Sequence, residues 1–68
     1  MDIIYSDHAK KRMKERGIED WEVEHILKHP SYIKKSADEK REAVGEIRYR
    51  KIKIVFRKEN YIKVITVM

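Results

Sequence analysis

The chain has 68 residues, a formal net charge of +5 and no cysteine. This length predicts one domain over residues 1–68 with a small core, and the lack of cysteine excludes disulfides and thiolate zinc sites. No stretch is apolar for long enough to be a signal peptide or a membrane span, so we expect a cytoplasmic protein without membrane contact. The basic balance favours anionic partners, above all nucleic acid.

A short extended segment at residues 2–5 and a helix over residues 7–16 are predicted to open the chain. Ser6 or Asp7 can cap the free amides at the start of this helix. Gly17 can adopt the left-handed conformation that ends it.

A second helix is predicted over residues 21–28. Glu19 or Asp20 caps its start, and Pro30 prevents it from continuing. The short connection to the first helix predicts two adjacent helices in a hairpin. The inward face of this second helix is formed by Val23, Ile26 and Leu27, with Trp21 at its margin.

After Pro30 the hydrophobic period changes from helical to alternating, which is typical of strands. The predicted strands span residues 32–35, 41–47, 50–57 and 61–67. Two helices followed by an antiparallel meander predict an α+β domain. We expect both helices to pack on one face of a three- or four-stranded antiparallel sheet.

The first helix places basic side chains beside its own apolar stripe. Ala9 and Met13 mark this stripe, and the helical period puts Arg16 and Arg12 within it or at its edge, with His8 one step further round. A buried arginine is costly unless it is paired or hydrogen-bonded. The first helix is therefore the first place to search for a functional site.

A family signature begins in this helix and continues along the rest of the chain. Its features are His8-Ala9, Arg12-Met13 and Arg16-Gly17-Ile18, followed by a second short helix and a C-terminal hairpin ending Val64-Ile65-Thr66-Val67. This order resembles the domain-of-unknown-function 4258 family, which is grouped with the barnase–EndoU–colicin–RelE superfamily of small metal-independent ribonucleases. Many members of that superfamily are toxins of toxin–antitoxin pairs. The resemblance implies a RelE-like fold of two helices on a curved antiparallel sheet, RNA cleavage, and an antitoxin protein as partner.

Metal-free RNA cleavage needs a base for the 2′-hydroxyl proton, an acid for the leaving 5′-oxygen, and cations for the charge that grows on the phosphate. An imidazole suits proton transfer near neutral pH, and guanidinium groups suit phosphate oxygens. On the strand assignment above, Arg41 and Thr66 would point toward the helix layer and join the first helix. The predicted catalytic residues are His8, Arg12, Arg16, Arg41 and Thr66. We assign His8 to proton transfer and the arginines to phosphate binding.

A structural interpretation competes with this catalytic one. Arg12 and Arg16 can pair with Glu42 or Glu46 and tie the helix to the sheet, and His8 can bond to backbone. The second proton-transfer group also stays open among Glu46, Tyr49 and Lys51.

A second basic cluster is predicted on the strands. It consists of Arg48, Arg50, Lys51, Lys53 and Arg57. Basic side chains interleaved with aromatic ones suit single-stranded RNA, whereas strand lysines also deter aggregation at sheet edges. The alternative function is therefore a non-catalytic module of the same fold that binds RNA, DNA or a protein.

Three further features leave questions open. His25 and His29 have the spacing of a metal-chelating pair, but no third ligand is evident, so we predict no metal site and no cofactor. Val67 and Met68 either close the core or form part of a homodimer interface, which leaves monomer and homodimer both possible. Enrichment in lysine and glutamate is typical of hyperthermophilic proteins, so a thermophilic source would also explain the charge density.

Overall fold

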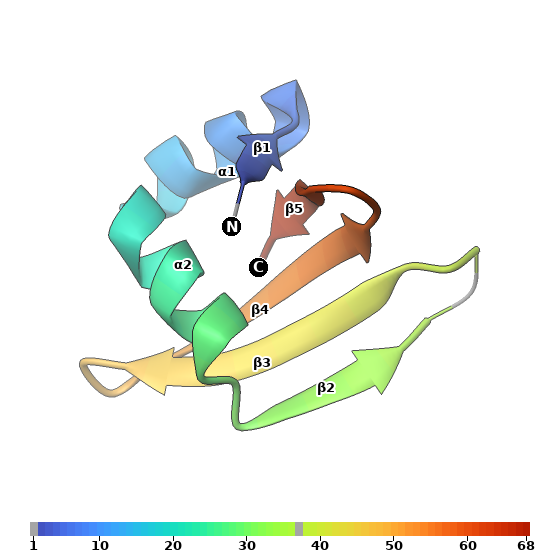
Figure 1. Cartoon of the computed structure of the whole chain (residues 1–68). Helices are drawn as coiled ribbons and strands as arrows, with labels where there is room; N and C mark the ends of the chain where they lie inside the picture. Colours follow the sequence, from blue (N-terminus) through green and yellow to red (C-terminus); the bar gives the residue numbers. More distant parts are fainter. Residues whose placement is uncertain (1, 37) are drawn as a thin grey trace.

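Two helices cover one face of a five-stranded sheet (Figure 1). The computed structural model describes residues 2–36 and 38–68. The strand order is β1-β5-β4-β3-β2, and α1 packs against β5 while α2 packs against β3 and β4. The predicted α+β class with two helices is confirmed. The elements are β1 (Ile3–Tyr5), α1 (Asp7–Arg16), α2 (Asp20–Lys28), β2 (Tyr32–Lys35), β3 (Arg41–Ile47), β4 (Arg50–Lys58) and β5 (Ile62–Val67).

The sheet is mixed, which corrects the expectation of an antiparallel sheet with three or four strands. β1 runs parallel to β5, with Ile3 opposite Ile62 and Tyr5 opposite Val64. The other neighbouring strands are antiparallel. The extended segment near the start of the chain therefore becomes a fifth strand by pairing with the last one. A local sequence pattern cannot reveal this pairing, because the two strands are far apart along the chain.

Capping residues set the helix bounds close to the predicted positions. The Ser6 hydroxyl accepts a hydrogen bond from the Ala9 amide at 3.0 Å, and Gly17 ends α1 with a φ of 65°. α2 begins one residue earlier than predicted. Glu19 and Glu22 form a capping box there, in which each side chain accepts a hydrogen bond from the other residue's backbone amide.

The main core lies between the helices and the sheet. Gly45 of β3 is part of it, because a Cβ atom there would lie 2.9 Å from two side-chain carbons of Ile26 in α2. The missing side chain thus lets α2 approach β3 closely. Val67 is fully buried, so this residue closes the core. The best-buried members are Ala9, Val23, Ile26, Ala43, Ile52, Ile54, Val64 and Val67.

A β-bulge in β5 places Thr66 on the face of the sheet opposite to the helices. Phe56 pairs with Val64, and its neighbour Val55 pairs with Thr66, so Ile65 is the extra residue. Phe56 and Val64 belong to the core, so Val55 and Thr66 lie on the other face. The prediction that Thr66 faces the helices was wrong, because one extra residue reverses the alternation of a strand.

Candidate nucleic-acid interface

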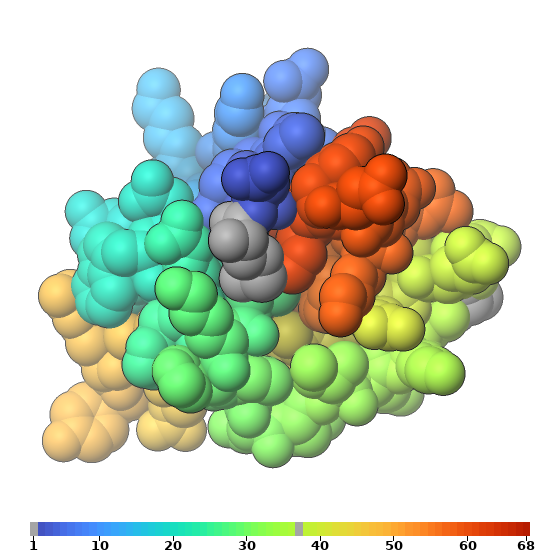
Figure 2. Space-filling model, in the orientation of Figure 1, coloured from blue at the N-terminus to red at the C-terminus, as the bar shows by residue number. Residues whose placement is uncertain are grey.

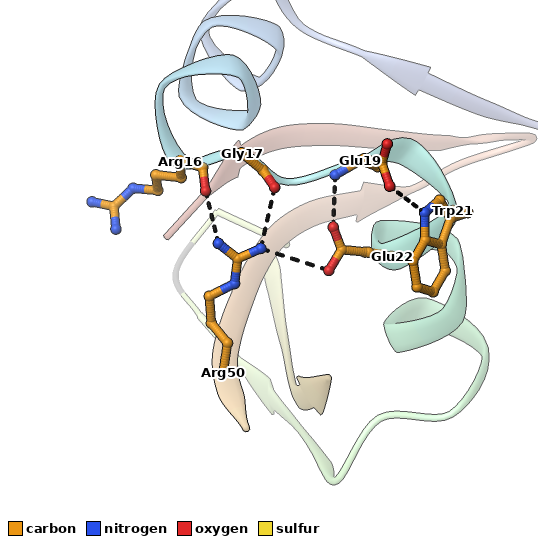
Figure 3. Close-up of polar contacts among 6 residues, drawn as sticks. All are labelled: Arg16, Gly17, Glu19, Trp21, Glu22 and Arg50. Carbon is orange, nitrogen blue, oxygen red and sulfur yellow. Dashed lines mark hydrogen bonds and ion pairs between the residues drawn. The ribbon is translucent and has the colours of Figure 1, made fainter. Parts of the chain in front are cut away.

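The predicted catalytic side chains of α1 lie at the surface. His8 and Arg16 are exposed and Arg12 is half-buried, whereas α1 buries only Ala9 and Met13. The prediction that Arg16 and His8 lie against the core was therefore wrong, whereas the half-buried Arg12 fits its predicted place at the edge of the apolar stripe. Arg16 occupies the last turn, and its side chain points away from the neighbouring polar contacts (Figure 3).

His8 and Arg12 nevertheless share a concavity, which we call the α1 concavity. Its volume is about 210 Å³, and its lining residues are His8, Lys11, Arg12 and Glu15. All four come from one face of the same helix. Within the described residues no ion pair ties Arg12 or Arg16 to the sheet. Glu42, one of the partners considered for them, pairs with Lys53 instead at 3.7 Å.

Arg41 lines a larger concavity at one end of the sheet, which we call the sheet-end pocket. Its volume is about 310 Å³, and its lining residues are Lys35, Ser36, Glu39, Lys40, Arg41 and Lys58. Strand pairing explains part of this gathering, because Lys35 lies opposite Arg41 and Arg41 lies opposite Phe56. Figure 1 shows this end of β3 and β2 at the right, whereas the helices lie at the left.

The sheet-end pocket has an excess of positive charge. Four of its side chains are cationic and one, Glu39, is anionic. Over residues 2–36 and 38–68 no ion pair neutralises any of the four cations. A concave site lined by one sign of charge raises the local concentration of the opposite charge. This arrangement therefore fits an anion such as a phosphate group.

The five predicted catalytic residues do not meet in one cleft. His8 and Arg12 line the α1 concavity, and Arg41 lines the sheet-end pocket. Thr66 lies on the opposite face of the sheet, and Arg16 extends from the end of α1.

Arg50, which the sequence predicts to bind nucleic acid, connects the junction between the two helices to the sheet (Figure 3). Its Nη1 donates to the carbonyl of Arg16 at 2.7 Å, and its Nη2 donates to the carbonyl of Gly17 at 3.2 Å. The same Nη2 lies 3.6 Å from Oε2 of Glu22. Glu22 is 2% exposed, and its Oε2 accepts no hydrogen bond within the described part of the chain. Arg50 is thus the charge that offsets the burial of this carboxylate.

Three more members of the predicted strand cluster contact their own chain. The cluster's surface is therefore less available to a ligand than its composition suggests. Lys51 has no such contact within the residues that the structure describes. The contacts are Arg48 over the Trp21 ring (5.3 Å to its centroid), Lys53 with Glu42 (3.7 Å) and Arg57 donating to the Asp38 carbonyl (3.1 Å).

Sequence reasoning missed the lysines of the sheet-end pocket. Lys35, Lys40 and Lys58 are spread over 24 positions, and only the pairing of β2, β3 and β4 brings them together. One signal was present in the sequence. Lys35 and Arg41 flank the predicted connection between two strands, and residues in such positions end up near each other when the strands pair.

Other candidate features give no further site. The rings of His25 and His29 lie 5.4 Å apart, and the described residues contain no group of three or more side chains able to hold a metal ion. Neither described helix has the length and apolar character needed to cross a membrane.

A comparison with protein families gives one match. The family model described as "Domain of unknown function (DUF4258)" matches residues 5–68. The chain belongs to the DUF4258 family. No curated protein and no solved structure matches it. The DUF4258 match includes both the α1 concavity and the sheet-end pocket, so both concavities are parts of the family domain.

Proposed function

We propose that this DUF4258 protein binds RNA by its phosphates at the sheet-end pocket. The observation that carries this proposal is the gathering of four cationic side chains and one carboxylate in a single concavity. Contacts to phosphates supply most of the affinity in non-specific binding of nucleic acids. The Arg41 guanidinium can hold two oxygens of one phosphate, and the lysines add point charges around it.

Size and family resemblance support single-stranded RNA as the ligand. A volume of about 310 Å³ is that of a small-ligand site, so it suits a nucleotide of a flexible strand better than the convex surface of a duplex. The expected grouping of the DUF4258 family with metal-independent ribonucleases supports RNA over DNA.

The test compares two variants with equal charge loss. Arg41→Glu with Lys58→Glu alters the pocket, and Lys10→Glu with Lys14→Glu alters exposed residues of α1 outside both concavities. Binding of a fluorescent single-stranded RNA is measured by anisotropy. We expect the pocket variant to lose about tenfold or more in affinity and the control to lose much less. Equal losses, or a wild-type protein that binds no RNA, would overturn the proposal.

A metal-independent endoribonuclease is the second candidate, and the α1 concavity favours it. In this candidate His8 and Glu15 share the two proton transfers, and Arg12 stabilises the charge on the phosphate. The 2′-oxygen forms a bond to phosphorus as the bond to the 5′-oxygen breaks, which leaves a 2′,3′-cyclic phosphate and a 5′-hydroxyl. A toxin role and an antitoxin partner belong to this candidate.

Incubation of RNA with the protein and a metal chelator tests cleavage directly. The candidate predicts cleavage that disappears in His8→Ala and Arg12→Ala while Lys10→Ala stays active. Several RNAs that remain intact, alone and with ribosomes, would contradict it and leave RNA binding as the function.

A further inference from the structure

The turn between β3 and β4 has an unusual backbone for its residues. Arg48 and Tyr49 form a two-residue loop, because Ile47 pairs with Arg50. Both loop residues have positive φ, 54° and 64°, as in a type I′ turn. Such turns favour Asn-Gly, since bulky L-residues rarely adopt this conformation. A glycine-containing turn would be more stable here, so the tyrosine calls for another explanation.

The tyrosine ring gains nothing from packing that could compensate for this backbone. Tyr49 is 100% exposed. Figure 2 shows the light-orange atoms of this turn projecting from the lower left of the molecule. A planar ring is thus held in solvent by a strained, two-residue loop.

Two more planar groups lie at the same end of the molecule. The guanidinium of Arg48 lies 5.3 Å from the centroid of the Trp21 ring, and Trp21 itself is 44% exposed. The Trp21 indole also donates to a carboxylate oxygen of Glu19 at 2.6 Å, which fixes the ring. The tip of the turn is therefore anchored to α2 through Arg48, while Tyr49 stays free to contact a ligand.

We infer that Tyr49 stacks on an unpaired RNA base. This inference rests on the proposed function, with the phosphates held at the sheet-end pocket and a base held at the turn. Tyrosine side chains stack on any base, and guanidinium planes add to such stacks. The seven residues of β3 separate the two sites by about 20 Å, which about six stacked nucleotides of one strand can span.

A protein partner is the competing ligand, because Trp, Tyr and Arg are also the residues that dominate protein interfaces. The charge of the tip favours RNA. Arg48 and Lys51 flank the exposed ring along the chain, and neither forms an ion pair within the described residues.

Tyr49→Gly separates a binding role from a structural one, because the two roles predict different outcomes. Glycine relieves the positive φ, so we expect the Tm to rise by about 4 °C or more. The affinity for an oligouridylate of about ten nucleotides should nevertheless fall by about fivefold to a hundredfold. Tyr49→Phe keeps the ring and should bind within about twofold of the wild type.

Inorganic polyphosphate serves as a ligand without bases. Tyr49→Gly should leave its affinity unchanged, whereas Arg41→Glu with Lys58→Glu should weaken it. Unchanged oligouridylate affinity in Tyr49→Gly overturns the stacking role, leaves the pocket proposal intact and points to a protein partner for the turn. If the pocket variant binds both ligands as the wild type does, the proposed function fails; if the wild type binds neither, both proposals fail.

Discussion

Among single residues, Arg50 is expected to stabilise the fold through its contacts with Glu22 and the junction of the helices. Arg50→Ala leaves the Glu22 carboxylate buried without its charge partner and frees the carbonyls of Arg16 and Gly17. Losing the partner of a buried charge costs about 3–5 kcal/mol, but the Arg50 side chain is 44% exposed and solvent weakens the pair, so we expect about 2 kcal/mol. Urea unfolding of the wild type and the variant measures this loss.

Glu22→Gln in the Arg50→Ala background is the matched control. It removes the orphaned charge and keeps the shape of the side chain, so it should recover about 1 kcal/mol. A loss below about 0.5 kcal/mol for Arg50→Ala, or no recovery in the double variant, would show that the contact does not stabilise the fold.

The raised pKa of Tyr5 leads us to expect that the folded protein becomes less stable at high pH. Burial, assisted by the carboxylates of Glu24 and Asp20, raises its pKa from 10.0 to about 12. An acid with a higher pKa in the folded state contributes stability that is complete below the unfolded pKa and is lost as pH rises through the folded pKa. This stability is therefore lost as the pH rises from 10.0 to about 12.

Phenolate absorbance checks this shift. The difference between the titrations of the wild type and Tyr5→Phe isolates one phenol, and we expect its midpoint near the upper end of that pH range. A midpoint at the ordinary pKa of tyrosine would show that the partial burial of Tyr5 does not raise its pKa.

Residues that act locally were predictable from the sequence. Ser6 marks the start of α1 and Gly17 marks its end, as predicted, because capping depends on a few neighbouring backbone groups. The Arg50–Glu22 contact was not predictable, since it joins positions 28 residues apart that meet only after the helices dock on the sheet.

Between elements, Gly45 sets how closely α2 approaches β3. Gly45→Ala would bring a Cβ atom to 2.9 Å from two carbons of Ile26. Ile26 is β-branched and fully packed, so it cannot rotate away, and we expect a loss of about 1–3 kcal/mol in unfolding free energy.

A double-mutant cycle with Ile26→Ala identifies the cause of this loss. Ile26→Ala removes both close carbons, so Gly45→Ala should cost clearly less in that background than in the wild type. An equal cost in both backgrounds would mean that the glycine acts through the backbone of β3 and not through this contact.

The hydrophobic periodicity of the sequence predicted the type and approximate bounds of each element. It did not predict which residues of neighbouring strands lie opposite each other. Residues 41–47 form a strand as predicted, because alternation is a local property. The bulge at Ile65 and the parallel pairing of β1 depend on the partner strand, so the sequence pattern placed Thr66 on the wrong face.

For the whole molecule, topology decides which charges form a site. The sequence indicated Arg41 but neither Lys35 nor Lys58, because only strand pairing brings the ends of β2 and β4 beside the start of β3 at one end of the sheet. The sequence pattern also suggested that Arg50 and Lys53 are free to bind a ligand, although both have ion-pair partners in the folded chain. Net charge therefore predicted an anionic ligand, and the fold gathers four cationic side chains at one end of the sheet.

The salt dependence of RNA binding tests the sheet-end pocket most directly. Each phosphate that a cation neutralises adds about 0.7 to the slope of log affinity against log salt for a single strand. Arg41→Ala with Lys58→Ala should reduce this slope by about 1 to 2. Lys10→Ala with Lys14→Ala should leave it close to the wild-type value. Identical slopes for the wild type and the pocket variant would contradict phosphate binding at this end of the sheet.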